Sequence, residues 1–220
     1  MAESKKHSPE AILESVGPTY PGLRLIMGQD QFKLTGPFPL LDSDRIIDEY
    51  ILEIEFPNQF PAIRPNVREV ANRIHRIADR HVYLPSGNFC LAIPEEEHKI
   101  WKPGGSILEF LKNPVTNFLI YQTHFELKGV WPHGQWSHGL PGRLEFYQEK
   151  LRTKDPKEIM TYLRLLAQPG IQWHAKCPCN NGTIIQRCSL HRTRIIQARG
   201  QIPFIAASDF CDKLMVYSKK

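Results

Sequence analysis

The sequence predicts an α+β protein, in which a small antiparallel sheet is followed by helices. Two stretches within the first 60 residues mix β-branched, aromatic and aliphatic side chains and end at glycine or proline, which is typical of strands. Residues 106–127 instead carry apolar side chains at intervals near 3.6, the period of a helix. Further helical patterns follow residue 128, beside a cluster of cysteines.

The sheet is predicted from the first third of the chain. A short helical patch at residues 11–16 comes first, and a Gly-Pro pair ends it. Antiparallel strands are predicted in three places: residues 23–39, 48–57 and 66–70. The stretch before the third strand has prolines at positions 57, 61 and 65, which exclude a helix because proline lacks the N–H that a helix needs.

A long helix is predicted after an irregular, proline-containing segment that bears Cys90. It starts after Ser106, whose hydroxyl suits an N-cap, and it runs to about residue 127. Pro114 interrupts this helix, because its ring clashes with the preceding turn.

The region from residue 128 onward has a different pattern. A loop rich in glycine, proline, tryptophan and histidine leads to an amphipathic helix at residues 144–151 and to another that Asp155 opens. The loop side chains that could line a groove or bind metal are His133, Trp136 and His138. We favour packing roles for them, because no second pair of metal ligands at helical spacing accompanies them.

Composition and charge indicate a globular protein and exclude several other classes. At 220 residues, the chain is long enough for one domain of ordinary size and a smaller second one, and 41% of its residues are hydrophobic. No apolar run approaches the roughly 18 residues of a membrane-spanning helix, and the N-terminal residues do not resemble a signal peptide. A cytoplasmic protein without a membrane partner is therefore expected. The net charge of +5 is mostly scattered, so nucleic acid is not the expected partner.

The number and positions of the cysteines favour catalytic or metal-binding roles over disulfide bonds. Five cysteines, an odd number in a chain without an export signal, indicate catalytic or metal-binding use. Cys90 stands alone after a Pro-Ser-Gly turn, whereas Cys177, Cys179 and Cys188 lie within twelve residues. The chain therefore has two candidate centres.

Three stretches in a fixed order resemble the core of a ubiquitin-conjugating enzyme. They are YILEIEFPNQFPAIRPNVREV at residues 50–70, HVYLPSGNFCL at 81–91 and WKPGGSILEFLKNPVTNFL at 101–119. The resemblance covers about residues 10–125 and implies the ubiquitin-conjugating-enzyme-like fold, in which a small antiparallel sheet packs on helices. Residues 1–127 are expected to form this domain, and residues 128–220 a helical C-terminal extension.

The resemblance implies that Cys90 is the catalytic residue, which forms a thioester with the C-terminus of a partner protein. A thiolate suits such a relay because it is a strong nucleophile and also a fair leaving group. His81 matches the histidine of the family's His-Pro-Asn element, whose role is mainly to hold the loop. The asparagine of that element, which supports the oxyanion, is missing, because Val82 and Tyr83 follow the histidine. Asn88 is the nearest substitute, with a simple turn residue as the alternative.

A run of glutamates and a tryptophan follow Cys90 in the sequence. Residues 95–97 are three glutamates, for which a solvated loop is favoured over attraction of an incoming amine. Trp101 is predicted to be a structural anchor under this loop, because a tryptophan buries a large area.

A second resemblance concerns the C-terminal cysteines. Their spacing is similar to that of small zinc motifs of the SEC-C type, within about residues 173–195. The thiol ligands would be Cys177, Cys179 and Cys188. Ser189 stands where that family places the fourth ligand, so His191 or the upstream His174 is expected to complete the site. The resemblance implies one structural zinc, which takes four such ligands in a tetrahedron; buried thiols without metal are the alternative.

The combination looks like the prokaryotic branch of the ubiquitin-conjugating family. Members of that branch accompany ubiquitin-like carriers or, in anti-phage cyclic-oligonucleotide signalling systems, act on the C-terminus of the cyclic-nucleotide synthase. The expected partner is therefore a protein C-terminal tail, and an activating enzyme is a further candidate partner. Two alternatives stay open: a non-catalytic module that holds such a tail, and a basic, zinc-containing nucleic-acid-binding protein.

Overall fold

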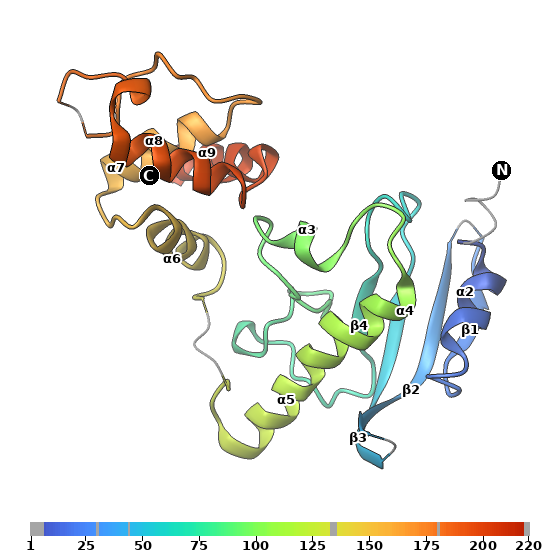
Figure 1. The fold of residues 1–220 in the computed structure, drawn as a ribbon. Helices are drawn as coiled ribbons and strands as arrows, with labels where there is room; N and C mark the ends of the chain where they lie inside the picture. Colours follow the sequence, from blue (N-terminus) through green and yellow to red (C-terminus); the bar gives the residue numbers. More distant parts are fainter. Residues whose placement is uncertain (1–6, 30, 44, 133–135, 180, 218–220) are drawn as a thin grey trace. The chain divides into compact units, whose positions relative to one another are not determined.

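The chain divides into two compact units in a computed structural model that describes residues 7–29, 31–43, 45–132, 136–179 and 181–217 (Figure 1). The first unit comprises Met1–Leu91 and His98–Gly134. The second comprises Ala92–Glu97 and Gln135–Lys220. The short segment that follows Cys90 and Leu91 therefore belongs with the C-terminal part of the chain, although the sequence suggested a single division after residue 127.

A four-stranded antiparallel sheet forms the first unit's centre, which confirms the predicted α+β class. Its strands pair in sequence order: β1 (Arg24–Met27), β2 (Phe32–Asp42), β3 (Arg45–Glu55) and β4 (Asn66–Glu69). The prediction of three strands was wrong, because its first stretch turns back on itself. The turn begins at Gly28, whose N–H donates to the Gln31 carbonyl at 2.7 Å.

The first unit also contains helices and helical turns. In chain order they are α2 (Pro9–Val16), a 3₁₀ turn (Ala78–Arg80), α3 (Glu97–Ile100), whose first residue belongs to the second unit, α4 (Ile107–Phe110), a π-helical turn (Leu111–Val115) and α5 (Thr116–Lys128). The predicted cap of α4 is confirmed, because the Ser106 hydroxyl accepts the Glu109 N–H at 3.4 Å. Pro114 lies inside the π-helical turn, where the predicted helix is interrupted.

Alternation along the strands separates an apolar face from a charged face. The apolar face packs on α2 and on the helices from α4 to α5, which lie in front of the strands in Figure 1. Its buried residues include Leu34, Phe38, Leu52, Ile54 and Val67, and the helices contribute Ile12, Val16, Phe110, Val115 and Leu119. On the other face, Glu53 pairs with Lys33 at 2.6 Å and with Arg68.

An ion-pair network joins β3 to α5. Both terminal nitrogens of Arg73 donate to the Asp48 carboxylate at 2.7 Å, and one also donates to Glu126 at 2.8 Å. The Arg73 guanidinium stacks over the Tyr50 ring at 4.0 Å, and the Thr123 hydroxyl donates to Asp48 at 2.7 Å. The network fixes the helix whose inner residues position the candidate active site.

Asp48→Asn is expected to lower the free energy of unfolding of the first unit by about 1 kcal/mol at neutral pH, because solvent weakens this partly exposed pair. The Arg73 hydrogen bonds hold the pKa of Asp48 at about 2, below the ordinary 3.8. The ionised Asp48 carboxylate therefore stabilises the fold at pH values above its ordinary pKa, and this contribution is lost as the pH falls through about 2. Urea unfolding at neutral and acidic pH measures how much of the free energy of unfolding is lost on acidification, and this loss should be smaller in the variant. An equal loss in the variant and the wild type would show that Asp48 does not contribute to it.

The second unit is helical. It contains α6 (Leu140–Leu151), α7 (Pro156–Leu166), a 3₁₀ turn (Ile185–Arg187), α8 (Ser189–Arg199) and α9 (Phe204–Tyr217). Asp155 caps α7 as predicted, since its carboxylate accepts the Lys157 N–H at 2.9 Å. Helix α6 starts four residues before the predicted 144. In the part of the chain that the structure describes, no helix is long and apolar enough to cross a membrane.

Side chains from four of these helices form the second unit's core. It includes Phe146, Tyr147, Leu163, Ile195 and Phe210. Trp136 packs against it with its ring 6.1 Å from Phe146, in agreement with the predicted packing role, whereas His133 lies outside the described residues.

A buried ion network anchors the Ala92–Glu97 segment within the second unit. Arg143 of α6 donates to Glu95 at 2.6 and 2.9 Å and to Asp209 of α9 at 2.6 Å. Glu95 has no exposed surface. The prediction of a solvated loop is therefore wrong for Glu95, because its charge is paired inside the unit instead of facing water. Burial acts against the charged form of Asp209, but the paired cations outweigh it and hold its pKa below the ordinary value.

Candidate active site and candidate metal site

Cys90 lies in a short antiparallel pairing that follows the sheet. Val82 pairs with Phe89, and the flanking hydrogen bonds run from the Tyr83 N–H to Asn88 and from the Cys90 N–H to His81, both at 2.8 Å. The Phe89 N–H also donates to the Val67 carbonyl of β4 at 2.7 Å, which ties this pairing to the sheet. Gly87 closes the turn with a φ of +76°, a conformation that favours glycine.

Strand alternation places the three predicted site residues on one side of this pairing. Val82 and Phe89 point inward and are buried, so the side chains before and after them point outward. His81, Asn88 and Cys90 are each half-buried on that outer side. Cys90 is therefore not a core residue, and its sulfur lies at the surface of a rigid, sheet-bonded segment.

Helix α5 fixes the residue that precedes this site. The Arg80 side chain is buried; its guanidinium donates to Gln122 at 2.6 Å and to Glu126 at 3.0 Å. The Gln122 amide also donates to the Arg80 carbonyl at 2.6 Å. These bonds hold both the side chain and the backbone at the start of the segment.

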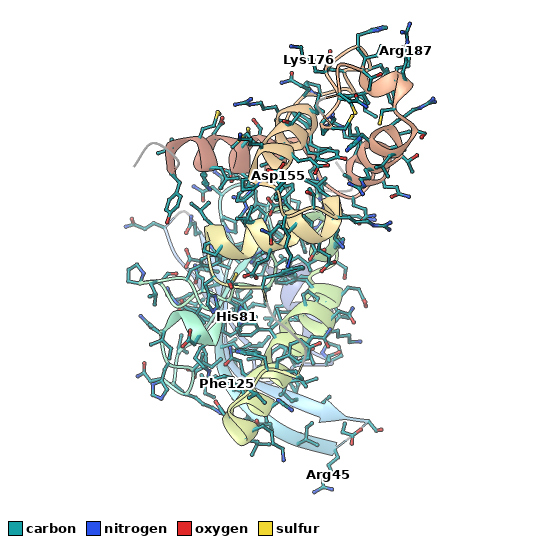
Figure 2. The ribbon with its side chains drawn as sticks, turned by 90° about the vertical axis from the view of Figure 1, so that its left-hand side faces the viewer. Arg45, His81, Phe125, Asp155, Lys176 and Arg187 are labelled. Carbon is teal, nitrogen blue, oxygen red and sulfur yellow. The ribbon has the colours of Figure 1, made fainter. Side chains whose placement is uncertain are left out.

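His81 supports the loop through its ring. Its backbone has a φ of +50°, in the left-handed region, and its ring meets Trp131 edge-on with centroids 4.6 Å apart. Trp131 donates its ring N–H to the Asp79 carbonyl at 3.1 Å and packs on Phe125 of α5, which is labelled with His81 in Figure 2. These contacts favour the loop-holding role predicted for His81. The sequence had no signal for Trp131.

Tyr83 is the side chain that sequence reasoning missed. Its hydroxyl lies 3.5 Å from the Cys90 sulfur, close enough for the thiol to donate a weak hydrogen bond to it. Tyr83 is 48% exposed and stands two residues after His81, where the resemblance to ubiquitin-conjugating enzymes would place an asparagine. Asn88 shares the outer side, and its backbone pairs with Tyr83. A role of the Asn88 side chain in supporting the oxyanion thus stays a prediction, whereas the contact between the Tyr83 hydroxyl and the Cys90 sulfur is present in the structure.

Trp101 is a structural residue, as predicted. It is buried, its ring N–H donates to the Pro61 carbonyl at 3.2 Å, and it packs edge-on against Phe110 at 5.6 Å. It joins the proline-rich stretch before β4 to the helix after the active segment.

The C-terminal cysteines and one histidine form a cluster in the second unit. The ligand atoms of Cys177, Cys179, Cys188 and His191 all lie within 4.8 Å of one another. The loop that carries the first two is closed by pairing of Lys176 with Ile184, and it lies at one end of this unit, where Lys176 and Arg187 are labelled in Figure 2. The four residues can hold a metal ion.

The cluster's geometry comes from the start of α8. Cys188 is the N-cap of this helix, and His191 lies three residues on, so both side chains lie on one side of the first turn. The Cys188 sulfur is 3.1 Å from His191 Nδ1. Hydrogen bonds from the backbone and side chain of His191 lower the pKa of the Cys188 thiol to about 6, whereas burial raises that of Cys177. A thiolate at Cys188 is the form that binds metals.

His191 is oriented by a carboxylate from a different helix. Its Nε2 lies 3.1 Å from Glu158 of α7, which leaves Nδ1 facing the sulfurs. Glu158 is itself held by the Thr153 hydroxyl at 2.7 Å. Such a carboxylate partner fixes the ring of a metal-binding histidine. His174, the other predicted candidate, is exposed and lies outside the cluster.

The donor set fits zinc. Three thiols and one imidazole form a Cys₃His set, and tetrahedral zinc would hold such ligand atoms roughly 3.5 to 3.8 Å apart. Shifts of about an ångström would bring the cluster to that geometry. Comparisons with protein-family models, with curated proteins and with solved structures found no match to this chain. The candidate function therefore rests on the chemistry of the two sites.

Proposed function

We propose that the chain is a cysteine acyltransferase of the ubiquitin-conjugating type, which carries the C-terminus of a partner protein as a thioester on Cys90. The observation that carries the proposal is the placement of Cys90: half-buried, on the outer side of a sheet-bonded segment, with its sulfur against the Tyr83 hydroxyl. A structural cysteine would instead lie in the core. The antiparallel sheet with helices on one face supports the same family.

The proposed reaction has two balanced steps. The Cys90 thiolate attacks the carbonyl carbon of an acyl thioester on an activating enzyme; a new C–S bond forms, the old one breaks, and the enzyme's thiolate leaves with the electron pair. An amine of the acceptor then attacks the Cys90 thioester; a C–N bond forms, the C–S bond breaks, the Cys90 thiolate leaves with the electron pair, and the amine proton passes to water. A ubiquitin-like carrier and a cyclic-nucleotide synthase, as in anti-phage defence, are the proposed sources of the C-terminus.

The second unit has a structural part in this proposal. A closed Cys₃His site has no open position for a substrate, so a zinc ion there would stabilise the fold and would not take part in acyl transfer. Cys177, Cys179, Cys188 and His191 would hold it.

Cys90→Ala is expected to abolish the acyl adduct and to leave the fold intact, because removing a half-exposed sulfur opens little cavity. The tagged chain is expressed with the genes that neighbour its own and purified under acidic, non-reducing conditions. Intact mass spectrometry should find an adduct that thiol reductants cleave in the wild type. Cys90→Ser should give a reductant-resistant ester or no adduct.

Native alkylation separates this proposal from a core cysteine. A small alkylating reagent should label Cys90 in the folded protein, while the buried Cys211 stays unlabelled. If Cys90 resists alkylation and Cys90→Ala unfolds the first unit, the acyltransferase proposal is wrong.

A further inference from the structure

The Tyr83 hydroxyl lies 3.5 Å from the sulfur of the candidate nucleophile. We propose that Tyr83 is a catalytic residue, whose hydroxyl donates a hydrogen bond to the oxyanion that forms when an amine attacks an acyl thioester on Cys90. The inference rests on the proposed acyl transfer and names the group that stabilises its charged intermediate.

The backbone holds Tyr83 in place on both sides. Its N–H donates to the Asn88 carbonyl at 2.8 Å, and its carbonyl accepts the Gly87 N–H at 2.7 Å. The Ser86 hydroxyl reinforces the turn by accepting the Asn88 N–H at 3.2 Å. Because Tyr83 precedes the turn and Cys90 follows it, these bonds also fix the separation of the two side chains. The backbone that carries the hydroxyl is thus fixed before any substrate arrives, and the contact with the sulfur places the hydroxyl beside the reacting atom, which suits oxyanion stabilisation.

The position of the hydroxyl suits a thioester oxygen. The carbonyl oxygen of an acyl group on Cys90 lies two bonds from the sulfur, so a donor in contact with the sulfur lies within reach of that oxygen. In the free enzyme the thiol donates to the Tyr83 oxygen at 3.5 Å. Acylation removes the thiol proton, and the phenol can then turn its own O–H toward the acyl oxygen.

Tyr83 ends the step in the form in which it began. The amine attacks the carbonyl carbon, a C–N bond forms, and the carbonyl π pair moves onto oxygen. The Tyr83 O–H donates to that negative oxygen and keeps its proton. When the carbonyl re-forms, the C–S bond breaks, the Cys90 thiolate leaves with the pair, and the amine proton passes to water.

Tyr83 carries this role better than Asn88, the substitute predicted from the sequence. The hydrogen bonds described for Asn88 are made by its backbone, within the turn and in the pairing with Arg68 of β4, and none of them brings its side-chain amide to the sulfur. The tyrosine hydroxyl, in contrast, lies 3.5 Å from the sulfur. The two residues can be tested against each other in one assay.

The assay uses a small thioester in place of a partner protein. The full-length chain is acylated with the mercaptoethanesulfonate thioester of N-acetylglycine, and peptide mass spectrometry confirms loading at Cys90. Discharge to ethanolamine is then timed by intact mass. Tyr83→Phe should slow discharge about 10²-fold, the usual cost of one lost oxyanion donor, without changing the amount loaded. Tyr217→Phe, which removes an exposed hydroxyl from the second unit, should change nothing.

Each outcome decides between the claims. If Tyr83→Phe discharges at the wild-type rate, or if only Asn88→Ala slows discharge, the role given to Tyr83 is wrong and the acyltransferase proposal stands. If the wild-type thioester discharges no faster than the same acyl group on a short cysteine peptide, both proposals fail. Thermal unfolding of each variant checks that a slow rate does not reflect loss of structure.

Discussion

Replacing Cys188 with serine is expected to leave the second unit without its metal and to unfold it at a lower temperature. Binding of a structural zinc contributes on the order of 10 kcal/mol in small metal-folded peptides, so losing a ligand removes several kcal/mol of folding free energy. Serine is the substitution of choice, because it is close to cysteine in size and is favoured at an N-cap, the position that Cys188 occupies in α8. Elemental analysis should find about one zinc per wild-type chain and none in the variant.

His174→Ala is the matched control for the metal site. His174 is exposed and outside the cluster, so this variant should keep its zinc, whereas His191→Ala should lose it. Circular dichroism on heating reports the stability of the helices in each variant. A wild-type chain that folds fully without metal would contradict the zinc assignment.

Arg143→Met is expected to destabilise the second unit by about 3–5 kcal/mol, because it leaves the Glu95 carboxylate buried without its partner. The loss includes the bond to Asp209 and the one to the Ala206 carbonyl at 3.0 Å. Urea unfolding of the variant and the wild type measures the difference in their free energy of unfolding. Hydrogen exchange should show faster exchange in Ala92–Glu97, the segment that begins two residues after Cys90.

Two controls separate the buried pair from general effects of charge. Lys213→Met removes an exposed partner of Asp209 at 2.9 Å and should cost less than about 1 kcal/mol. Combining Glu95→Gln with Arg143→Met removes both charges and should recover part of the stability. Equal losses in Lys213→Met and Arg143→Met would show that burial of Glu95 is not the cause.

Residues whose structure depends on near neighbours could be predicted from the sequence. Ser106 and Asp155 cap α4 and α7 as expected, because a cap is formed by a side chain and an N–H two or three residues away. The hairpin of β1 and β2 was missed, although the polar run that starts at Gly28 (Gly-Gln-Asp-Gln) is typical of a short hairpin turn between two strands.

The candidate active site was predictable only in part. The spacing of His81, Asn88 and Cys90 could be read from the chain, but the contact of Tyr83 with the sulfur depends on the turn that pairs residues seven apart. Trp131 reaches His81 from beyond α5, and no local pattern connects positions 50 residues apart. Such contacts depend on how the helix packs on the sheet.

The sequence by itself determined the α+β class, the helix caps and three closely spaced thiols, because each depends on residues close together along the chain. The tertiary structure decided the fourth member of the cluster: His191 follows Cys188 by one helical turn and is oriented by Glu158, 33 residues away. It also decided that Glu95 is buried, since Arg143 lies 48 residues further on. A charge can leave water only where the fold brings it an opposite charge, and that pairing is not encoded in local spacing.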